Sequence, residues 1–186
     1  MSHPLLIAPI GRSLLRLAGP TTAVMVVQIA VAVSEAWFVA QVGIDALAGI
    51  ALVIPFITLM MNMANGGMGG GVASALARAL GAGRHEDARA LVLHALLLGL
   101  ACGLVFTIFA WTALPVVFRW LGGSGPVLQQ ALAFSTVWFS GGAVLWSSAF
   151  LSALLRGGGD SATPSRIGFV LSVVYIPLLG VLTLGI

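Results

Sequence analysis

Long apolar segments, separated by short polar or glycine-rich breaks, run along almost the whole chain. A transmembrane helix needs about 20 predominantly apolar residues to cross the hydrocarbon core of a bilayer. The segments that reach this length lie at residues 17–41, 46–80, 88–117, 127–155 and 164–184. We therefore expect an all-α polytopic membrane protein with about five transmembrane helices.

The segment at 46–80 is too long for one perpendicular crossing of the membrane. It must tilt strongly, protrude from the bilayer or bend. Pro55 and the glycine-rich run at 65–71 are the positions where we expect a bend, because proline and glycine weaken the helical hydrogen-bond ladder.

The overall composition excludes a soluble fold. The chain of 186 residues is 60% hydrophobic and only 7% charged, whereas soluble domains carry about 25% charged residues. Its formal net charge of +3 comes from eight arginines without a lysine. In so apolar a chain this basicity reports membrane orientation, so we expect the lipid bilayer as a partner and no nucleic acid.

The arginines are distributed unevenly over the two ends of the predicted helices. Arg119 lies alone on one side, and the others lie on the side of the N-terminus: Arg12, Arg16, Arg78, Arg84, Arg89, Arg156 and Arg166. The positive-inside rule then predicts a multi-pass protein of the plasma (inner) membrane with a cytoplasmic N-terminus. Five crossings end outside, at Ile186, without a closing loop. Because transporters are commonly built from paired repeats, we expect this chain to be a fragment of a longer protein.

Glu35 lies well inside the first apolar segment. A carboxylate at membrane depth costs on the order of 2.5 kcal/mol or more, so its default interpretation is functional. Gln28, seven residues earlier, falls on the same helix face. The pair indicates a cation or proton site facing a cavity. Alternatively, Glu35 reaches headgroup water from near the helix end or pairs with an arginine.

Small residues recur through the second segment. Gly67 and Gly71 belong to a ridge with a four-residue repeat, and Gly66 and Gly70 lie beside it. Such a ridge lets another helix approach closely, which favours packing. The same glycine run could serve as a hinge in alternating access. Both interpretations stand at this point.

Further polar or irregular positions lie in the second and fifth segments. Asn62 and Asn65 could line the same cavity as Glu35, or they could hydrogen-bond across helices. Pro177 could kink the fifth helix and expose backbone carbonyls near Tyr175. We therefore assign Gln28 and these three polar residues to a candidate substrate cavity.

Enzyme and metal motifs are not found. The histidines show no metal-ligand spacing, so no metal site is assigned and no cofactor is expected beyond a coupling ion. The run at 66–71 lacks the Gly-Lys-Ser/Thr ending of a phosphate-binding loop. Ser140 does not lie in a G-x-S-x-G turn, so nothing supports an intramembrane hydrolase.

Three sequence blocks together resemble the multidrug and toxic compound extrusion (MATE) family of transporters. They are SEAWFVAQVGIDALAGIAL at 34–52, ASALARALGAGRHEDAR at 73–89 and LRGGGDSATP at 155–164. The resemblance implies two six-helix lobes around a central cavity, with drug expelled in exchange for Na⁺ or H⁺. Residues 1–186 would then form an incomplete N-terminal lobe, and the missing C-terminal lobe would be a partner.

The resemblance also assigns roles to individual residues. In the family a carboxylate in the first helix takes part in cation coupling, and Glu35 occupies the matching position. Gln28 falls near positions that line the cavity in relatives. Many relatives carry Asn-x-x-x-Asp in the fifth helix, whereas the corresponding residues here are Tyr175 and Leu179. A single carboxyl group can bind a proton without further oxygen ligands, so H⁺ is favoured over Na⁺.

The resulting hypothesis is a cation-coupled antiporter that exports small, often cationic, xenobiotics by alternating access, and not an enzyme. The alternative is a flippase for lipid-linked polysaccharide or cell-wall precursors, from the same broad superfamily. A flippase is expected to place several cationic side chains inside its cavity, and none of the eight arginines lies in the middle of a predicted helix.

Overall fold

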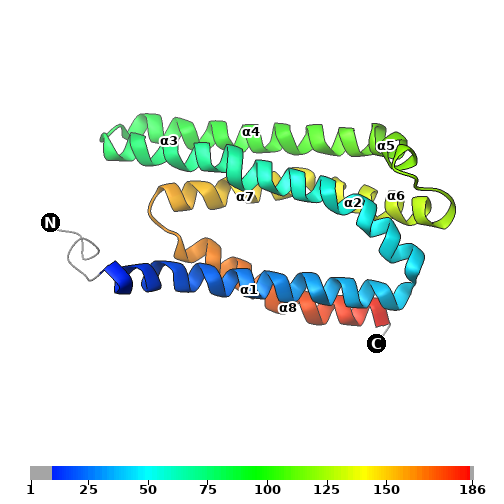
Figure 1. Cartoon of the computed structure of the whole chain (residues 1–186). Coiled ribbons are helices and arrows are strands. Elements are labelled where there is room, and N and C mark those ends of the chain that lie inside the picture. Colours follow the sequence, from blue (N-terminus) through cyan, green and yellow to red (C-terminus); the bar gives the residue numbers. More distant parts are fainter. Residues whose placement is uncertain (1–9, 185–186) are drawn as a thin grey trace. The chain divides into compact units, whose positions relative to one another are not determined.

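The computed structural model describes residues 10–184, and every regular element in that range is a helix. The chain divides into two compact units. Unit 1 contains α1 (Ile10–Val42) and α8 (Ala162–Leu184), and unit 2 contains the helices between them (Figure 1). Each unit is described by itself. The expectation of an all-α fold is confirmed.

The first part of unit 2 is one helical run of 38 residues. It comprises α2 (Ile44–Asn62), the π-helix η2 (Met63–Met68) and α3 (Gly69–Gly81). Pro55 lies inside α2 without ending it. The irregular stretch is η2, which overlaps the predicted glycine-rich run. A π turn is a rare local departure from α-helical geometry, and where it occurs it is often at a functional site.

Two of the predicted helices are divided in the structure. The segment predicted at 88–117 consists of α4 (His85–Thr112) and the short α5 (Leu114–Trp120). Pro115 lies at the start of α5, where its ring is incompatible with a continuous helix.

The segment predicted at 127–155 is divided in the same way. It consists of α6 (Gly125–Ser140) and α7 (Gly142–Gly157), which are bent by 49° at Gly141. Thr107 holds this break, because its hydroxyl donates to the carbonyl of Phe139 at 2.7 Å. The same hydroxyl lies 3.0 Å from the carbonyl of Gly103.

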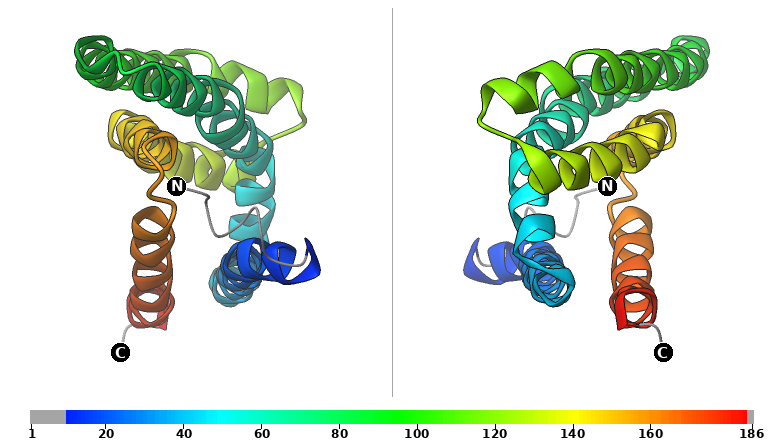
Figure 2. Two further views of the ribbon diagram at one scale, coloured as in Figure 1. Left: turned by 90° about the vertical axis from the view of Figure 1, so that its left-hand side faces the viewer. Right: turned by 90° about the vertical axis from the view of Figure 1, so that its right-hand side faces the viewer.

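The core of unit 2 lies between α7 and its neighbours. Helix α7 packs along α4 and α3, and α6 packs along α2 (Figures 1 and 2). Large side chains fill the interior, and Trp146 contacts the rings of Phe106 and Phe150 at centroid distances of 5.6 and 5.5 Å. Trp146, Phe150 and Phe118 are fully buried.

Close helix contacts are made by glycines other than the predicted ones. A Cβ atom on Gly103 would lie 2.3 Å from the Cα atom of Ala143, so α4 and α7 touch through their backbones. Comparable approaches occur at Gly49, against α6, and at Gly157, against α3.

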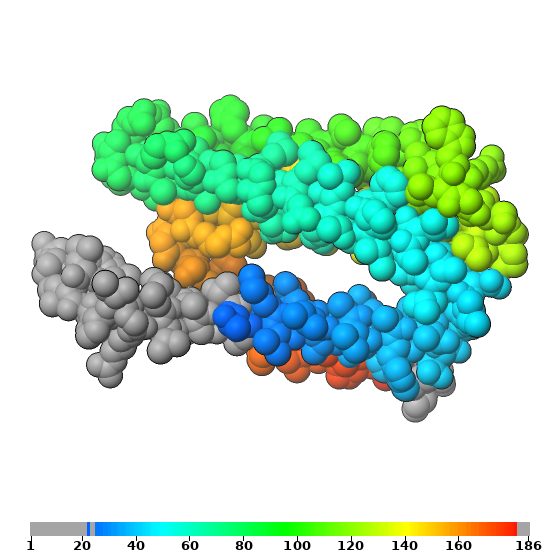
Figure 3. Space-filling model, viewed as in Figure 1, coloured from blue at the N-terminus to red at the C-terminus, as the bar shows by residue number. Residues whose placement is uncertain are grey.

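The glycines predicted for packing behave differently. Within the described part of the chain, an added Cβ atom would meet nothing within 4 Å at any of four positions: Gly66, Gly67, Gly70 and Gly71. Figure 3 shows the α2–α3 run, in cyan to green, uncovered on the face turned to the viewer. A side chain added at these four positions thus meets no neighbouring helix among the described residues, and the roles of these glycines in packing and as a hinge stay predictions.

The exterior of the helices is apolar. Ile44, Val137 and Val144 are 86%, 77% and 73% exposed, although burial of such side chains normally drives folding in water. Among the described residues, four helices are long and apolar enough to cross a membrane, or up to five if the bent α6–α7 pair forms one span. An apolar exterior on such helices is expected when lipid, and not water, is the solvent.

The contact between α4 and α7 gives a test of the packing. Gly103→Ala forces the two backbones apart, and overpacking of this kind destabilises by about 1–3 kcal/mol or more. We expect a lower midpoint of thermal unfolding in detergent. Gly70→Ala is the matched control, because its Cβ atom meets open space and alanine is the better helix former. Equal midpoints for the two variants would contradict the described α4–α7 contact.

Candidate functional site

The most distinctive polar contact in unit 1 joins α1 to α8. The phenol of Tyr175 donates a hydrogen bond to Glu35 Oε1, with an oxygen–oxygen distance of 2.5 Å across 140 residues of sequence. A bond this short is typical of a hydroxyl donating to an ionised carboxylate. The contact therefore brings together the acid predicted from the first segment and a candidate cavity residue of the fifth.

A second contact fixes how the two helices run. A Cβ atom on Gly180 would lie 3.1 Å from the ring of Phe38, so α8 approaches α1 closely there. Glu35 meets Tyr175 and Phe38 meets Gly180, so residue numbers rise together along both helices. Helices α1 and α8 are therefore parallel. Two helices separated by three further crossings must be parallel, which agrees with α6–α7 acting as one span.

The Glu35–Tyr175 pair lies within apolar helices, but both side chains are only partly buried. The candidate membrane spans Met25–Val42 and Ala162–Val181 contain the two residues. Glu35 is partly buried, and Tyr175 is 38% exposed. An accessible carboxylate within a span can exchange a proton or a cation with a water-filled cavity.

One alternative for Glu35 was pairing with an arginine. Two ion pairs lie in the α3–α4 turn region, Arg84 with Asp87 and Arg89 with Glu86, and all four side chains are exposed. The partner of Glu35 is the Tyr175 phenol. The described structure therefore favours a hydrogen-bonded acid within the span over an arginine pair.

The sequence placed Tyr175 in the cavity but did not predict its contact with Glu35. The expected partner in the fifth helix was a carboxylate, but a tyrosine hydroxyl can also meet the first-helix acid because it both donates and accepts hydrogen bonds. A usable signal was present: Tyr175 is the lone tyrosine of the chain, and the resemblance placed it at a position expected to face the first-helix acid.

The remaining predicted residues are placed as follows. Gln28 is exposed on α1, about two turns before Glu35. Pro177 lies inside α8, which continues beyond it to Leu184. Asn62 and Asn65 belong to unit 2. The Asn65 amide donates to the carbonyl of Met61 at 3.1 Å within its own helix.

Among the described residues, no group of three or more His, Cys, Asp or Glu side chains is placed to hold a metal ion. The chemistry available at the α1–α8 contact is therefore that of one carboxylate and one phenol. Such a pair can bind and release a proton, and the hydrogen bond between α1 and α8 changes when it does.

Comparison with known proteins identifies the family. Residues 20–180 match the MatE family. The chain belongs to this family of MATE transporters. The resemblance found in the sequence is thereby confirmed.

Two relatives are named for a function. The chain is 28% identical to an FAD transporter of Shewanella oneidensis over 99% of its own length and 40% of the relative. It is 27% identical to a probable multidrug resistance protein of Bacillus subtilis over 77% of its own length and 31% of the relative. The chain thus spans less than half the length of the relatives that it matches.

Solved structures agree with the fold. A multidrug resistance MATE transporter in an outward-facing conformation matches 95% of this chain and 39% of its own, with a TM-score of 0.83 and 28% identity. An inward-facing conformation matches 81% of this chain and 34% of its own, with a TM-score of 0.77 and 27% identity. A transporter from Pyrococcus furiosus, described as having a binding pocket of reverse polarity, matches 95% of this chain and 39% of its own, with a TM-score of 0.82 and 27% identity. The chain therefore has the fold of one lobe of these transporters.

A double-mutant cycle tests the α1–α8 contact. Glu35→Gln and Tyr175→Phe should show a coupling energy of about 0.5–2 kcal/mol in unfolding of the purified protein, the range for hydrogen bonds between membrane helices. The control cycle pairs Tyr175→Phe with Ser34→Ala, because the Ser34 hydroxyl donates to Ala30 within α1. That cycle should be additive within about 0.5 kcal/mol. Equal coupling in both cycles would show that the Glu35–Tyr175 bond does not form.

Proposed function

We propose that this protein is part of a cation-coupled multidrug efflux antiporter, with H⁺ as the favoured coupling ion. The hydrogen bond between Glu35 and Tyr175 is the observation that carries the proposal. It supplies an ionisable group inside a membrane span, and it links that group to a second span. Protonation of Glu35 changes the charge at this contact, so it can bias the arrangement of the two helices.

Charge at the α1–α8 contact couples the cation to the drug. With Glu35 ionised, the phenol donates to a charged acceptor, and a cationic drug in the cavity has a counter-charge. Proton binding neutralises the carboxyl group, weakens both interactions and favours drug release. A ligand can shift a conformational equilibrium only through such differences in affinity between states. Relatives solved in outward-facing and inward-facing conformations support alternating access as the cycle.

The exported substrate is proposed to be a small, often cationic, xenobiotic. Gln28 on α1 is an exposed polar side chain available to such a molecule, and within unit 2 the side chains of Asn62 and Asn65 are also exposed. The relative named as an FAD transporter makes an anionic dinucleotide the second candidate. An anion carrier, like the flippase alternative, is expected to place cationic side chains within the spans. The described arginines from Arg78 to Arg156 lie in the last turn of a helix or near its start.

Membrane orientation forms part of the proposal. Arg78, Arg84 and Arg89 lie around the α3–α4 turn, and Arg119 lies in the last turn of α5. This distribution supports a plasma-membrane protein with the α3–α4 turn and the N-terminus on the cytoplasmic side.

Transport by the full-length protein in vesicles tests the coupling role of Glu35. With a fluorescent lipophilic cation such as ethidium as substrate, Glu35→Gln should reduce efflux driven by a pH gradient about tenfold or more, the size expected for loss of coupling between two ligands. Asp45→Asn is the matched control, because Asp45 is an exposed acid in the first turn of α2. That variant should transport as the unchanged protein does.

The driving ion is decided in the same vesicles. A Na⁺ gradient that drives efflux equally in the unchanged protein and in Glu35→Gln would overturn both the H⁺ assignment and the coupling site. Export of FAD but not of ethidium would replace the xenobiotic with a dinucleotide.

A further inference from the structure

An apolar groove runs between α3 and α4 in unit 2. Its volume is about 330 Å³. The small residues Gly71 and Ala75 line it on α3, and Leu91 and Leu98 line it on α4. His94 is the one polar residue that lines it, and its Nδ1 atom is engaged with the carbonyl of Ala90 at 2.6 Å. The groove therefore presents a surface suited to a hydrocarbon chain.

The groove and Arg78 together cover about the depth of one bilayer leaflet along α3. Met68 lines the end of the groove farther from the α3–α4 turn, and Arg78 lies about one turn beyond Ala75, the last residue of α3 that lines it. Ten residues separate Met68 from Arg78, which is about 15 Å along a helix. The hydrocarbon core is about 30 Å thick, so half of it is about 15 Å. A chain lying in the groove would span one leaflet and end at the level of Arg78.

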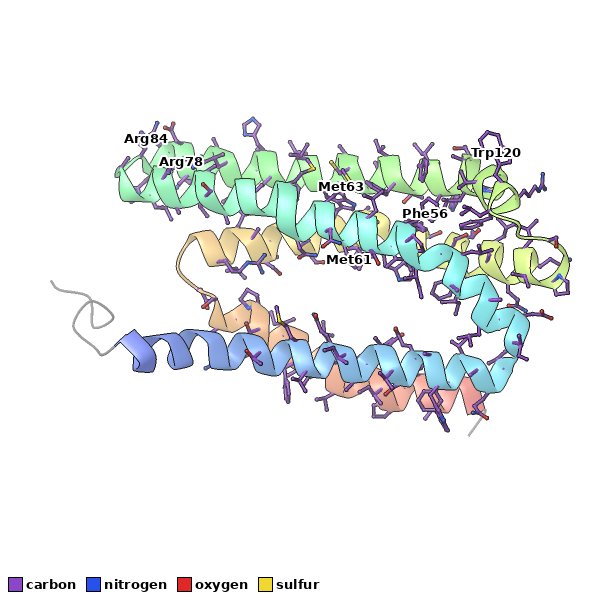
Figure 4. All side chains as sticks on the ribbon, in the orientation of Figure 1. Phe56, Met61, Met63, Arg78, Arg84 and Trp120 are labelled. Carbon is purple, nitrogen blue, oxygen red and sulfur yellow. The ribbon has the colours of Figure 1, made fainter. Side chains whose placement is uncertain are left out.

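Arg78 is the cation available at that end. The other two arginines near the α3–α4 turn are paired, Arg84 with Asp87 at 3.3 Å and Arg89 with Glu86 at 3.0 Å. Arg78 donates to the hydroxyl of Ser74 and forms no ion pair within residues 10–184. Its side chain is exposed, and Figure 4 shows Arg78 and Arg84 at the same end of the α3–α4 hairpin.

We propose that this groove binds one anionic phospholipid, with an acyl chain between α3 and α4 and the phosphate on Arg78. A guanidinium group suits a phosphate because its planar donors can form two parallel hydrogen bonds. Basic positions between membrane helices on the cytoplasmic side are typical of such lipid sites. The site is distinct from the α1–α8 contact and does not rest on the proposed transport.

Other occupants fit the groove less well. A lipophilic cation would meet the like charge of Arg78. A further membrane helix lying over the groove would bury that charge without a partner, which is costly in a low-dielectric environment. An anionic lipid satisfies the cation and the apolar walls together.

Lipid binding to the purified full-length protein tests the proposal. Native mass spectrometry would compare phosphatidylglycerol, phosphatidylcholine and oleate at matched concentrations. We expect phosphatidylglycerol to bind most tightly. Arg78→Gln should weaken its binding about fivefold, the effect of removing one cationic contact near the membrane surface. Arg119→Gln, at the last turn of α5, is the matched control and should leave binding unchanged.

A second pair of variants tests the acyl-chain contact. Gly71→Leu fills the groove, whereas Gly70→Leu places the same side chain outside it, and an added Cβ atom meets open space at both positions. Only Gly71→Leu should lose phosphatidylglycerol, with equal thermal midpoints for the two variants. An equal loss of phosphatidylglycerol binding in the two variants would overturn the site. Equal binding of phosphatidylglycerol and phosphatidylcholine would overturn it as well. Oleate binding as tightly as phosphatidylglycerol would overturn the phospholipid assignment, and displacement of the lipid by ethidium would make the groove part of the drug path.

Discussion

A hydrocarbon environment offers no hydrogen bonds, and this constraint shapes the whole structure. Every backbone donor and acceptor in a membrane span must find its partner within the protein, which helices achieve locally. The side chains follow the same logic. Ser34, Thr112, Ser140 and Ser172 each place a hydroxyl within hydrogen-bond distance of the carbonyl four residues earlier. These four hydroxyl groups can thus lie in apolar helices without being left unsatisfied.

The same constraint applies at the breaks in the helices. Where α6 ends and α7 begins, the regular ladder is interrupted, and Thr107 of α4 donates to the carbonyl of Phe139. The small size of Gly103 lets the two backbones come close enough for this contact. A bend in one helix is therefore stabilised by a side chain of its neighbour, and α4 and the α6–α7 pair depend on each other for their shape.

Hydropathy was sufficient to predict the fold class and the approximate spans, because the length of an apolar run is set directly by bilayer thickness. It did not predict the division at Gly141, since apolar residues continue on both sides of it. The glycine pattern indicated that a helix could approach at Gly66, Gly67, Gly70 and Gly71, and close approaches among the described residues occur at Gly49, Gly103 and Gly157. A glycine pattern shows where a helix can approach, and only the tertiary structure decides where one does. Likewise, Glu35 was recognisable as an acid out of place, whereas its partner depends on how α1 and α8 align.

The separation of Glu35 from Tyr175 has a consequence for biosynthesis. The two residues are 140 positions apart, and ribosomes add about 5–20 residues per second. Tyr175 of α8 is therefore made roughly 7–28 seconds after Glu35 of α1. During that interval the carboxyl group lacks the phenolic donor that α8 supplies in the folded protein.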